Sequence, residues 1–236
     1  MTTFHHPLLR PLCRALRSAL LLLALPVVLL TSCDVPSPRA SVVGGLEVCH
    51  GDLLFCIEEP TGDGLSDAIA NVTEGIDGSQ VVHVGIACER QGQMMVLEAT
   101  PSHGVWLTPI GKFVDEAEAD NDGRPAILVG RLRDTLGLAT SVERALQYIG
   151  LPYDTLYRPD AGQIYCSELV QLSYRRPDGT SIFPTRPMSF SDASGRIAPY
   201  WQRLYDERGL PVPEGAPGTN PADLSRDSLT LIIFKP

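Results

Sequence analysis

The sequence predicts an α+β fold built around an antiparallel sheet. Hydrophobic residues make up 44% of the 236 residues and charged residues 20%, which is typical of a globular protein. Segments rich in β-branched residues dominate the first half of the chain, and helical patterns dominate the second half. The net charge of −9 and the absence of a Lys/Arg cluster predict that the protein binds no nucleic acid.

The first 32 residues are predicted to be a signal peptide. Arg10, Arg14 and Arg17 precede an uncharged apolar run over residues 19–30. At about 1.5 Å per helical residue, that run covers roughly 18 Å, too short for a bilayer core of about 30 Å. It therefore matches the apolar region of a signal peptide.

The end of this segment predicts a lipid anchor. Leu30-Thr31-Ser32-Cys33 resembles the bacterial lipobox, in which the cysteine is lipidated and becomes the first residue of the mature protein. We therefore expect a lipoprotein anchored to a bilayer at Cys33 and facing the periplasm. Asp34 favours retention at the inner membrane. Residues 33–44 are predicted to form a tether, and residues 45–236 a single domain.

Within this domain the hydrophobic pattern predicts elements in the following order. Strands are expected over residues 51–57, 81–88, 94–99, 105–110, 126–132 and 229–234. Helices are expected over residues 65–73, 141–149, from 165 or 166 to 174, and 199–208. The acidic stretch 115–122 is interpreted as a solvated loop or helix face, and residues 209–221 as a loop.

A histidine and a glutamate are predicted to pair across the strands 81–88 and 94–99. If a four-residue loop over 89–92 joins these strands, Cys88 faces Gln93 and His83 faces Glu98 directly. A carboxylate in that position fixes the tautomer of the imidazole, as the base and its orienting partner do in a catalytic triad. If the register slips, Thr100 or His103 takes the place of Glu98.

Cys166 is the candidate nucleophile. It follows the loop-forming residues 160–162 and begins a helical pattern that places Leu169 and Val170 on its face. At the start of a helix, the dipole and the free backbone N–H groups stabilise a thiolate, and the N–H of Cys166 itself could bind an oxyanion.

These residues lie in motifs that resemble a known family. GDLLF at 51–55, HVGIA at 83–87 and CSELV at 166–170 are similar to three motifs of NlpC-type papain-like cysteine hydrolases. In the ordinary form of that family the cysteine motif comes first, whereas here it comes last. The order, and GLPYD at 150–154, resemble the circularly permuted branch of the YiiX, YebB and YaeF kind, which has lecithin:retinol acyltransferase-like proteins as distant relatives.

The resemblance implies a permuted papain-like fold in which the sheet packs against the helix that carries the cysteine. It also implies that Cys166 is the nucleophile, His83 the base and Glu98 the orienting residue. Tyr153 and Tyr165 are candidates for lining the substrate cleft. The implied activity is hydrolysis of an amide through an acyl-enzyme, with no metal or cofactor. The substrate stays open among cell-wall peptides, other peptides and amides of lysine side chains or acyl groups.

Two other functions remain alternatives: acyl transfer from the same thioester, and a binding lipoprotein without catalysis. A zinc site is not expected, because Cys49, His50, Cys56 and Cys88 lack the paired spacing of such sites. Buried free thiols and a disulfide among Cys49, Cys56 and Cys88 both stay open.

Overall fold

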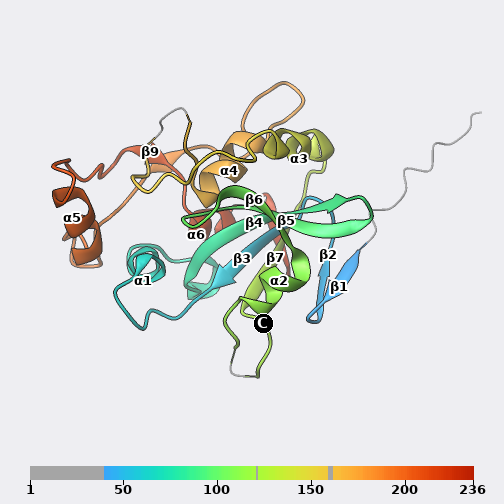
Figure 1. Ribbon diagram of the computed structural model, residues 1–236, viewed down its shortest axis with the longest axis horizontal. Coiled ribbons are helices and arrows are strands. Elements are labelled where there is room, and N and C mark those ends of the chain that lie inside the picture. The colour runs from blue at the N-terminus through green and yellow to red at the C-terminus, as the bar shows by residue number, and fades with distance from the viewer. Residues whose placement is uncertain (1–39, 121, 159–161) are drawn as a thin grey trace, which may run out of the picture. The chain divides into compact units, whose positions relative to one another are not determined.

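The computed structural model describes residues 40–236, except residue 121 and residues 159–161 (Figure 1). The predicted signal peptide, Cys33 and Asp34 lie outside the described residues. The described part belongs to one compact unit, Ser37–Pro236. Within it, no helix combines the length and the apolar character needed to cross a bilayer.

A six-stranded sheet forms the centre of this unit. Its strand order is β10-β7-β3-β4-β5-β6, and every neighbouring pair is antiparallel. The strands are β3 (Leu53–Ile57), β4 (Val81–Arg90), β5 (Gln93–Thr100), β6 (Gly104–Pro109), β7 (Ile127–Leu132) and β10 (Thr230–Phe234). All six predicted strands are therefore present, and the predicted antiparallel sheet is confirmed.

The helices lie on both faces of this sheet (Figure 1). They are α1 (Leu65–Ala70), α2 (Ile110–Asp115), α3 (Leu138–Leu146), α4 (Cys166–Ser173), α5 (Pro199–Asp206) and α6 (Pro221–Arg226). A short 3-10 helix, η1 (Ile76–Gly78), precedes β4. The predicted α+β class is confirmed.

Alternation along the strands separates two cores. Val84 and Ile86 share one core with Leu169 and Val170 of α4. Leu54, Cys56 and Ala87 belong to the second core, together with Phe113 of α2. The helix that carries Cys166 therefore packs on one face of β4, and α2 packs on the other.

The turn between β4 and β5 differs from the prediction. The hairpin pairs Arg90 with Gln93, so only Gln91 and Gly92 form the loop. Their φ angles of 52° and 79° are those of a type I′ turn, which matches the twist of paired strands. The predicted four-residue loop was wrong, and the register is shifted by two residues from the prediction.

Several of the described elements were not predicted. A hairpin of β1 (Ser41–Val43) and β2 (Leu46–Val48) turns at Gly44-Gly45, across the boundary between the predicted tether and the predicted domain. Helix α2 begins at Ile110, where a strand was expected to end. The loop predicted over 209–221 contains β9 (Pro217–Gly218), which pairs with β8 (Arg186–Pro187). Helix α6 begins at Pro221, where that loop was expected to end.

Candidate active site

His83 and Glu98 are in direct contact. The His83 Nε2 atom lies 2.8 Å from Glu98 Oε2, and the two side chains are 21% and 7% exposed. The corrected register places Glu98 diagonally from His83 rather than opposite it. A shift of two residues keeps both side chains on the same face, whereas a shift of one would have separated them. The glutamate side chain is long enough to reach the imidazole across this diagonal.

Two neighbouring residues determine the position of Glu98: one binds its carboxylate and the other leaves space beside it. Thr108 on β6 is fully buried, and its hydroxyl donates a hydrogen bond to Glu98 Oε1. Gly85 on β4 leaves room on the other side, because a Cβ atom there would lie 2.4 Å from Val96 Cγ1 and 3.6 Å from Glu98 Cβ. Neither role was predicted from the sequence. The helix that approaches this face is α2, whose Phe113 ring is centred 6.2 Å from the imidazole.

A β-bulge lies next to His83. Cys56 on β3 pairs with His83 and Ile57 pairs with Val81, which leaves Val82 as an extra residue in β4. Bulges bend the strand and redirect neighbouring side chains. Here the bulge lies at the end of β3 and the start of β4. It therefore affects the direction of the His83 side chain at this end of the sheet.

The segment before α4 brings Cys166 to the same end of the sheet. Gly150 and Leu151 exchange backbone hydrogen bonds with Val105, at the start of β6. Tyr153 then forms a parallel bridge with Ile164, two residues before Cys166. Gly104 permits this close approach, since its φ is 67° and a Cβ atom would lie 2.2 Å from the Leu151 carbonyl oxygen.

Cys166 occupies the first position of α4 and is 3% exposed. Its thiol interacts with His83 closely enough to be one of the causes that raise the pKa of the imidazole. Because Nε2 of His83 faces Glu98, Nδ1 is the nitrogen left for the thiol. The three side chains thus interact in the order Cys166, His83, Glu98.

The electrostatics favour a charged imidazole. Burial lowers the pKa of His83, but its hydrogen bonds with Cys166 and Glu98 outweigh burial and raise that pKa to about 10. Burial likewise raises the pKa of Glu98, but the hydrogen bond and charge of His83 outweigh this effect, so that the net shift is downward. An imidazolium between a carboxylate and a thiol at neutral pH is the arrangement that activates a cysteine nucleophile.

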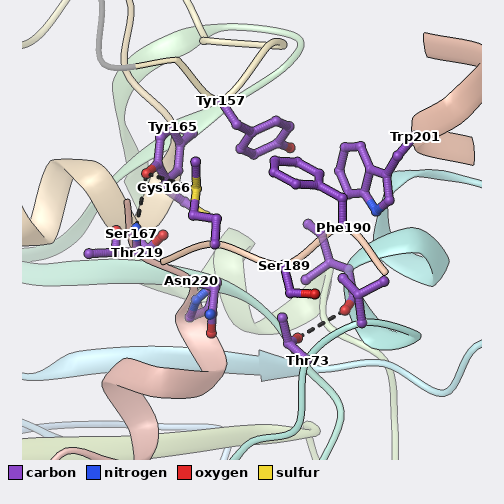
Figure 2. Close-up of a pocket in the computed structure, with 14 residues that line it drawn as sticks. Thr73, Tyr157, Tyr165, Cys166, Ser167, Ser189, Phe190, Trp201, Thr219 and Asn220 are labelled. Atoms are coloured by element: carbon purple, nitrogen blue, oxygen red, sulfur yellow. Dashed lines mark hydrogen bonds between the residues drawn. The ribbon is translucent and has the colours of Figure 1, made fainter. Parts of the chain in front are cut away.

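Two cavities meet at this chain of residues. A groove of about 600 Å³ is lined by His83, Glu98, Cys56 and Tyr153, among others, but not by Cys166. A narrow slot of about 40 Å³ is lined by Cys166 and Tyr165, but not by His83 (Figure 2). Of the residues that line these cavities, only Ile69 belongs to both. The catalytic candidates therefore stand between two spaces of different size.

The two candidate tyrosines border these different spaces. Tyr153 lines the groove and Tyr165 the slot. Tyr153 contacts Tyr157, with the hydroxyl oxygens 3.1 Å apart. Burial raises the pKa of Tyr153 well above its ordinary value, and it raises the pKa of Tyr165 to about 12. Both hydroxyls thus stay protonated at neutral pH.

The alternatives considered for Glu98, Thr100 and His103, line the same groove as His83 but contact other residues. His103 is stacked on Trp106 at 3.9 Å, and its Nδ1 contacts the Ser102 hydroxyl. The Thr100 hydroxyl also contacts Ser102. Cys49, Cys56, Cys88 and Cys166 are all free thiols. Among the residues that the structure describes, no three His, Cys, Asp or Glu side chains are grouped so that they could hold a metal ion.

The motif at 51–55 has a structural role that sequence reasoning missed. Asp52 is 1% exposed; its carboxylate accepts two hydrogen bonds from the Arg131 guanidinium, at 2.8 and 2.7 Å, and one from the Cys49 N–H. The Tyr174 hydroxyl, at the end of α4, donates to the Gly51 carbonyl at 3.0 Å. These bonds join the turn before β3 to β7 and to the helix that carries Cys166.

Comparisons with known proteins agree with this geometry. A structure search matches the crystal structure of the metalloprotein YiiX from Escherichia coli O157:H7, with 22% sequence identity and a TM-score of 0.62. The match covers 79% of this chain and 97% of YiiX. At this identity the similarity supports the fold. No curated protein matches the sequence significantly.

A family model provides the assignment. Residues 47–234 match the model of the permuted papain-like amidase enzymes, YaeF/YiiX. This range includes nearly all of the described residues and every candidate catalytic residue. The chain therefore belongs to the family of permuted papain-like amidases, whose members are papain-like cysteine hydrolases.

Proposed function

We propose that the protein hydrolyses an amide bond with Cys166 as nucleophile, His83 as base and acid, and Glu98 as the orienting residue. The contact of His83 with Glu98, together with the interaction of Cys166 with the same imidazole, carries this proposal. The thiolate sulfur attacks the carbonyl carbon, and the C–N bond then breaks. His83 delivers its proton to the leaving amine. Water hydrolyses the resulting thioester and regenerates the thiol.

The start of α4 supports binding of the intermediate. The first N–H groups of a helix have no acceptor within the helix, and the Cys166 N–H is one of these groups. Placed next to the attacking sulfur, it can donate to the oxyanion of the tetrahedral intermediate. Transfer of the acyl group to an amine or hydroxyl uses the same thioester and differs only in the acceptor.

We propose further that the protein is a lipoprotein of the bacterial envelope whose substrate is an amide outside the cytoplasm, such as a cell-wall peptide or an amide of a lysine side chain. The lipobox-like Leu30-Thr31-Ser32-Cys33 and the preceding apolar run support this location. Radiolabelled palmitate is expected to label the full-length protein but not Cys33→Ala. Equal labelling of both would refute lipidation at this site.

The catalytic proposal is tested by trapping the acyl-enzyme. Full-length protein in detergent is mixed with an activated acyl ester, quenched in acid and analysed by intact mass and peptide mapping. The expected result is an acyl adduct on Cys166 and turnover above the rate of Cys166→Ala. Cys49→Ala is the matched control, because Cys49 is also a buried thiol but lines neither cavity. Equal turnover by wild type and Cys166→Ala would leave a binding protein as the better description.

A further inference from the structure

The slot beside Cys166 has a character distinct from that of the groove. Its walls are the side chains of Ile69, Val72, Tyr157, Tyr165, Met188, Phe190, Trp201 and Pro221, together with Cys166 and the polar residues Thr73, Ser167, Ser189, Thr219 and Asn220. Apart from Cys166 itself, these residues include no Asp, Glu, Lys, Arg or His. The groove, by contrast, is lined by Glu58, Asp67, Glu98, Glu116, Lys112 and His83, among others.

The aromatic wall of the slot is tightly packed. Trp201 meets Tyr157 and Phe190 edge to face, with ring centroids 5.3 and 5.2 Å apart. Figure 2 shows Phe190 and Trp201 on one side of the slot and Tyr165 with Cys166 on the other, and the Tyr157 ring lies between them, 5.1 Å from that of Tyr165. A wall that is buried and packed in this way is preformed, so a ligand need not order it on binding.

The polar groups of the slot add no charge to it. The Asn220 side chain is occupied at the start of α6, where it accepts from the Asp223 N–H and donates to its carboxylate. The Tyr165 hydroxyl accepts a hydrogen bond from the Thr219 N–H. Trp201 Nε1, Ser167 Oγ and Thr219 Oγ1 are buried without a partner among the described residues. A carboxylate or ammonium group in the slot would therefore lose its hydration without gaining a counterion.

The positions of His83 and Cys166 determine which half of the substrate enters the slot. His83 protonates the leaving amine, so the amine half lies on the side of His83, which is the side of the groove. The acyl half lies beyond the sulfur of Cys166, on the side of the slot. We propose, on the basis of the proposed hydrolase activity, that the slot selects a short, uncharged acyl group.

The volume of the slot limits the length of this group. The slot measures about 40 Å³ against about 600 Å³ for the groove, so it suits a much smaller group than the groove does. Phe190 and Trp201 close the aromatic side, and both are at least 97% buried. We therefore expect the slot to select acyl groups by length as well as by charge.

Chloromethyl ketones test this proposal without requiring turnover. The Cys166 thiolate displaces chloride and forms a C–S bond, while the alkyl group of the ketone occupies the acyl side. Three probes are compared on the full-length protein: chloroacetone with a methyl group, 1-chloro-2-pentanone with a propyl group, and 5-chloro-4-oxopentanoic acid, whose carboxylate replaces the last methyl. Labelling rates of Cys166 are measured by mass spectrometry and divided by those of a free thiol in solution.

The propyl probe is expected to label Cys166 about 15-fold faster than the methyl probe, because each buried methylene contributes roughly a factor of four. The carboxylate probe is expected to be slower than both. Ser189→Phe, at an exposed residue that lines the slot, should abolish the advantage of the propyl group. Ser194→Phe is the control, because Ser194 is exposed on the same connection but does not line the slot.

The outcomes separate this proposal from the catalytic one. If Cys166 reacts rapidly but the three normalised rates agree within about twofold, the slot proposal is overturned and the catalytic proposal stands. A faster reaction of the carboxylate probe would also overturn it. If Cys166 reacts with all three probes no faster than a denatured thiol, both proposals fail. These rates on the wild-type protein decide the matter even if Ser189→Phe does not fold.

Discussion

His83 is the residue on which the proposed chemistry depends, because it contacts both other members of the candidate triad. Its pKa of about 10 means that the imidazole carries a proton at neutral pH. That proton is available for the leaving amine, and the positive charge stabilises a thiolate beside it. Glu98 contributes to both effects through its contact of 2.8 Å with Nε2.

Glu98→Gln is expected to shift the alkaline limb of the pH profile. The rate requires protonated His83 and should therefore fall as the pH rises through about 10. Glutamine removes a negative charge that raises the pKa of His83, so the limb should move to lower pH, and kcat should fall by about 10²- to 10⁴-fold. The measurement is kcat/KM from pH 6 to 11. An unmoved limb would show that Glu98 does not act through His83.

Thr108→Val tests the support of Glu98. Valine has nearly the same shape but cannot donate to Glu98 Oε1, so we expect kcat to fall about tenfold without a change in the substrate KM. Thr108→Ser restores the hydroxyl and should restore most of the rate. If valine and serine variants have equal rates, the hydrogen bond has no positioning role.

At the scale of elements, the active site depends on one close contact between backbones. The segment before α4 runs beside the start of β6, and Gly104 is the residue that allows this approach. Tyr153 and Cys166 are both positioned by that segment. A substitution at Gly104 should therefore disturb the position of Cys166, although Gly104 is not itself a catalytic residue.

Gly104→Ala is expected to destabilise the protein by about 2 to 3 kcal/mol and to slow alkylation of Cys166. Gly92→Ala is the control that separates backbone strain from the clash with Leu151. Gly92 has a φ of 79° but no atom within 4 Å of the position that a Cβ atom would take. This control should cost only about 1 kcal/mol for the backbone conformation, with alkylation unchanged. Urea denaturation and iodoacetamide kinetics measure the two quantities. Equal effects of both variants would mean that the contact with Leu151 is unimportant.

The elements also show where sequence reasoning succeeds. Runs of apolar and β-branched residues predicted every strand of the large sheet, because one or both faces of each strand are buried. Helix α2 was missed because it is only six residues long and follows β6 without a polar break. The hairpin turn was mispredicted although Gln91-Gly92 contains the glycine that a type I′ turn favours. The resulting error in register was two residues. Because an even shift keeps side chains on the same face of the sheet, His83 and Glu98 are still in contact.

At the scale of the whole molecule, the site joins residues 83, 98 and 166, which are far apart in the chain. The motif order and the strand pattern predicted that these residues would meet. Thr108, Gly104 and the slot could not be predicted, because they depend on which loops approach one another in space. The Asp52–Arg131 pair was missed for the same reason, since 79 positions separate its members.

Asp52→Asn is expected to lower the free energy of unfolding by about 3 kcal/mol, because it leaves the Arg131 guanidinium without its buried partner. Asp63→Asn is the control, since the side chain of Asp63 is 94% exposed and its ion pair with Arg203 spans 3.7 Å. That variant should change stability by less than about 0.5 kcal/mol. Similar urea midpoints for both variants would contradict the structural role of Asp52.

The reactivity of Cys166 tests the central claim most directly. Iodoacetamide at neutral pH should alkylate Cys166 far faster than the other described thiols, because burial raises the pKa of Cys49, Cys56 and Cys88, that of Cys88 to about 11. His83→Ala should slow alkylation of Cys166 strongly, and Glu98→Ala should slow it less. If Cys166 instead reacts no faster than a denatured thiol, or if His83→Ala leaves its rate unchanged, Cys166 is not the activated nucleophile.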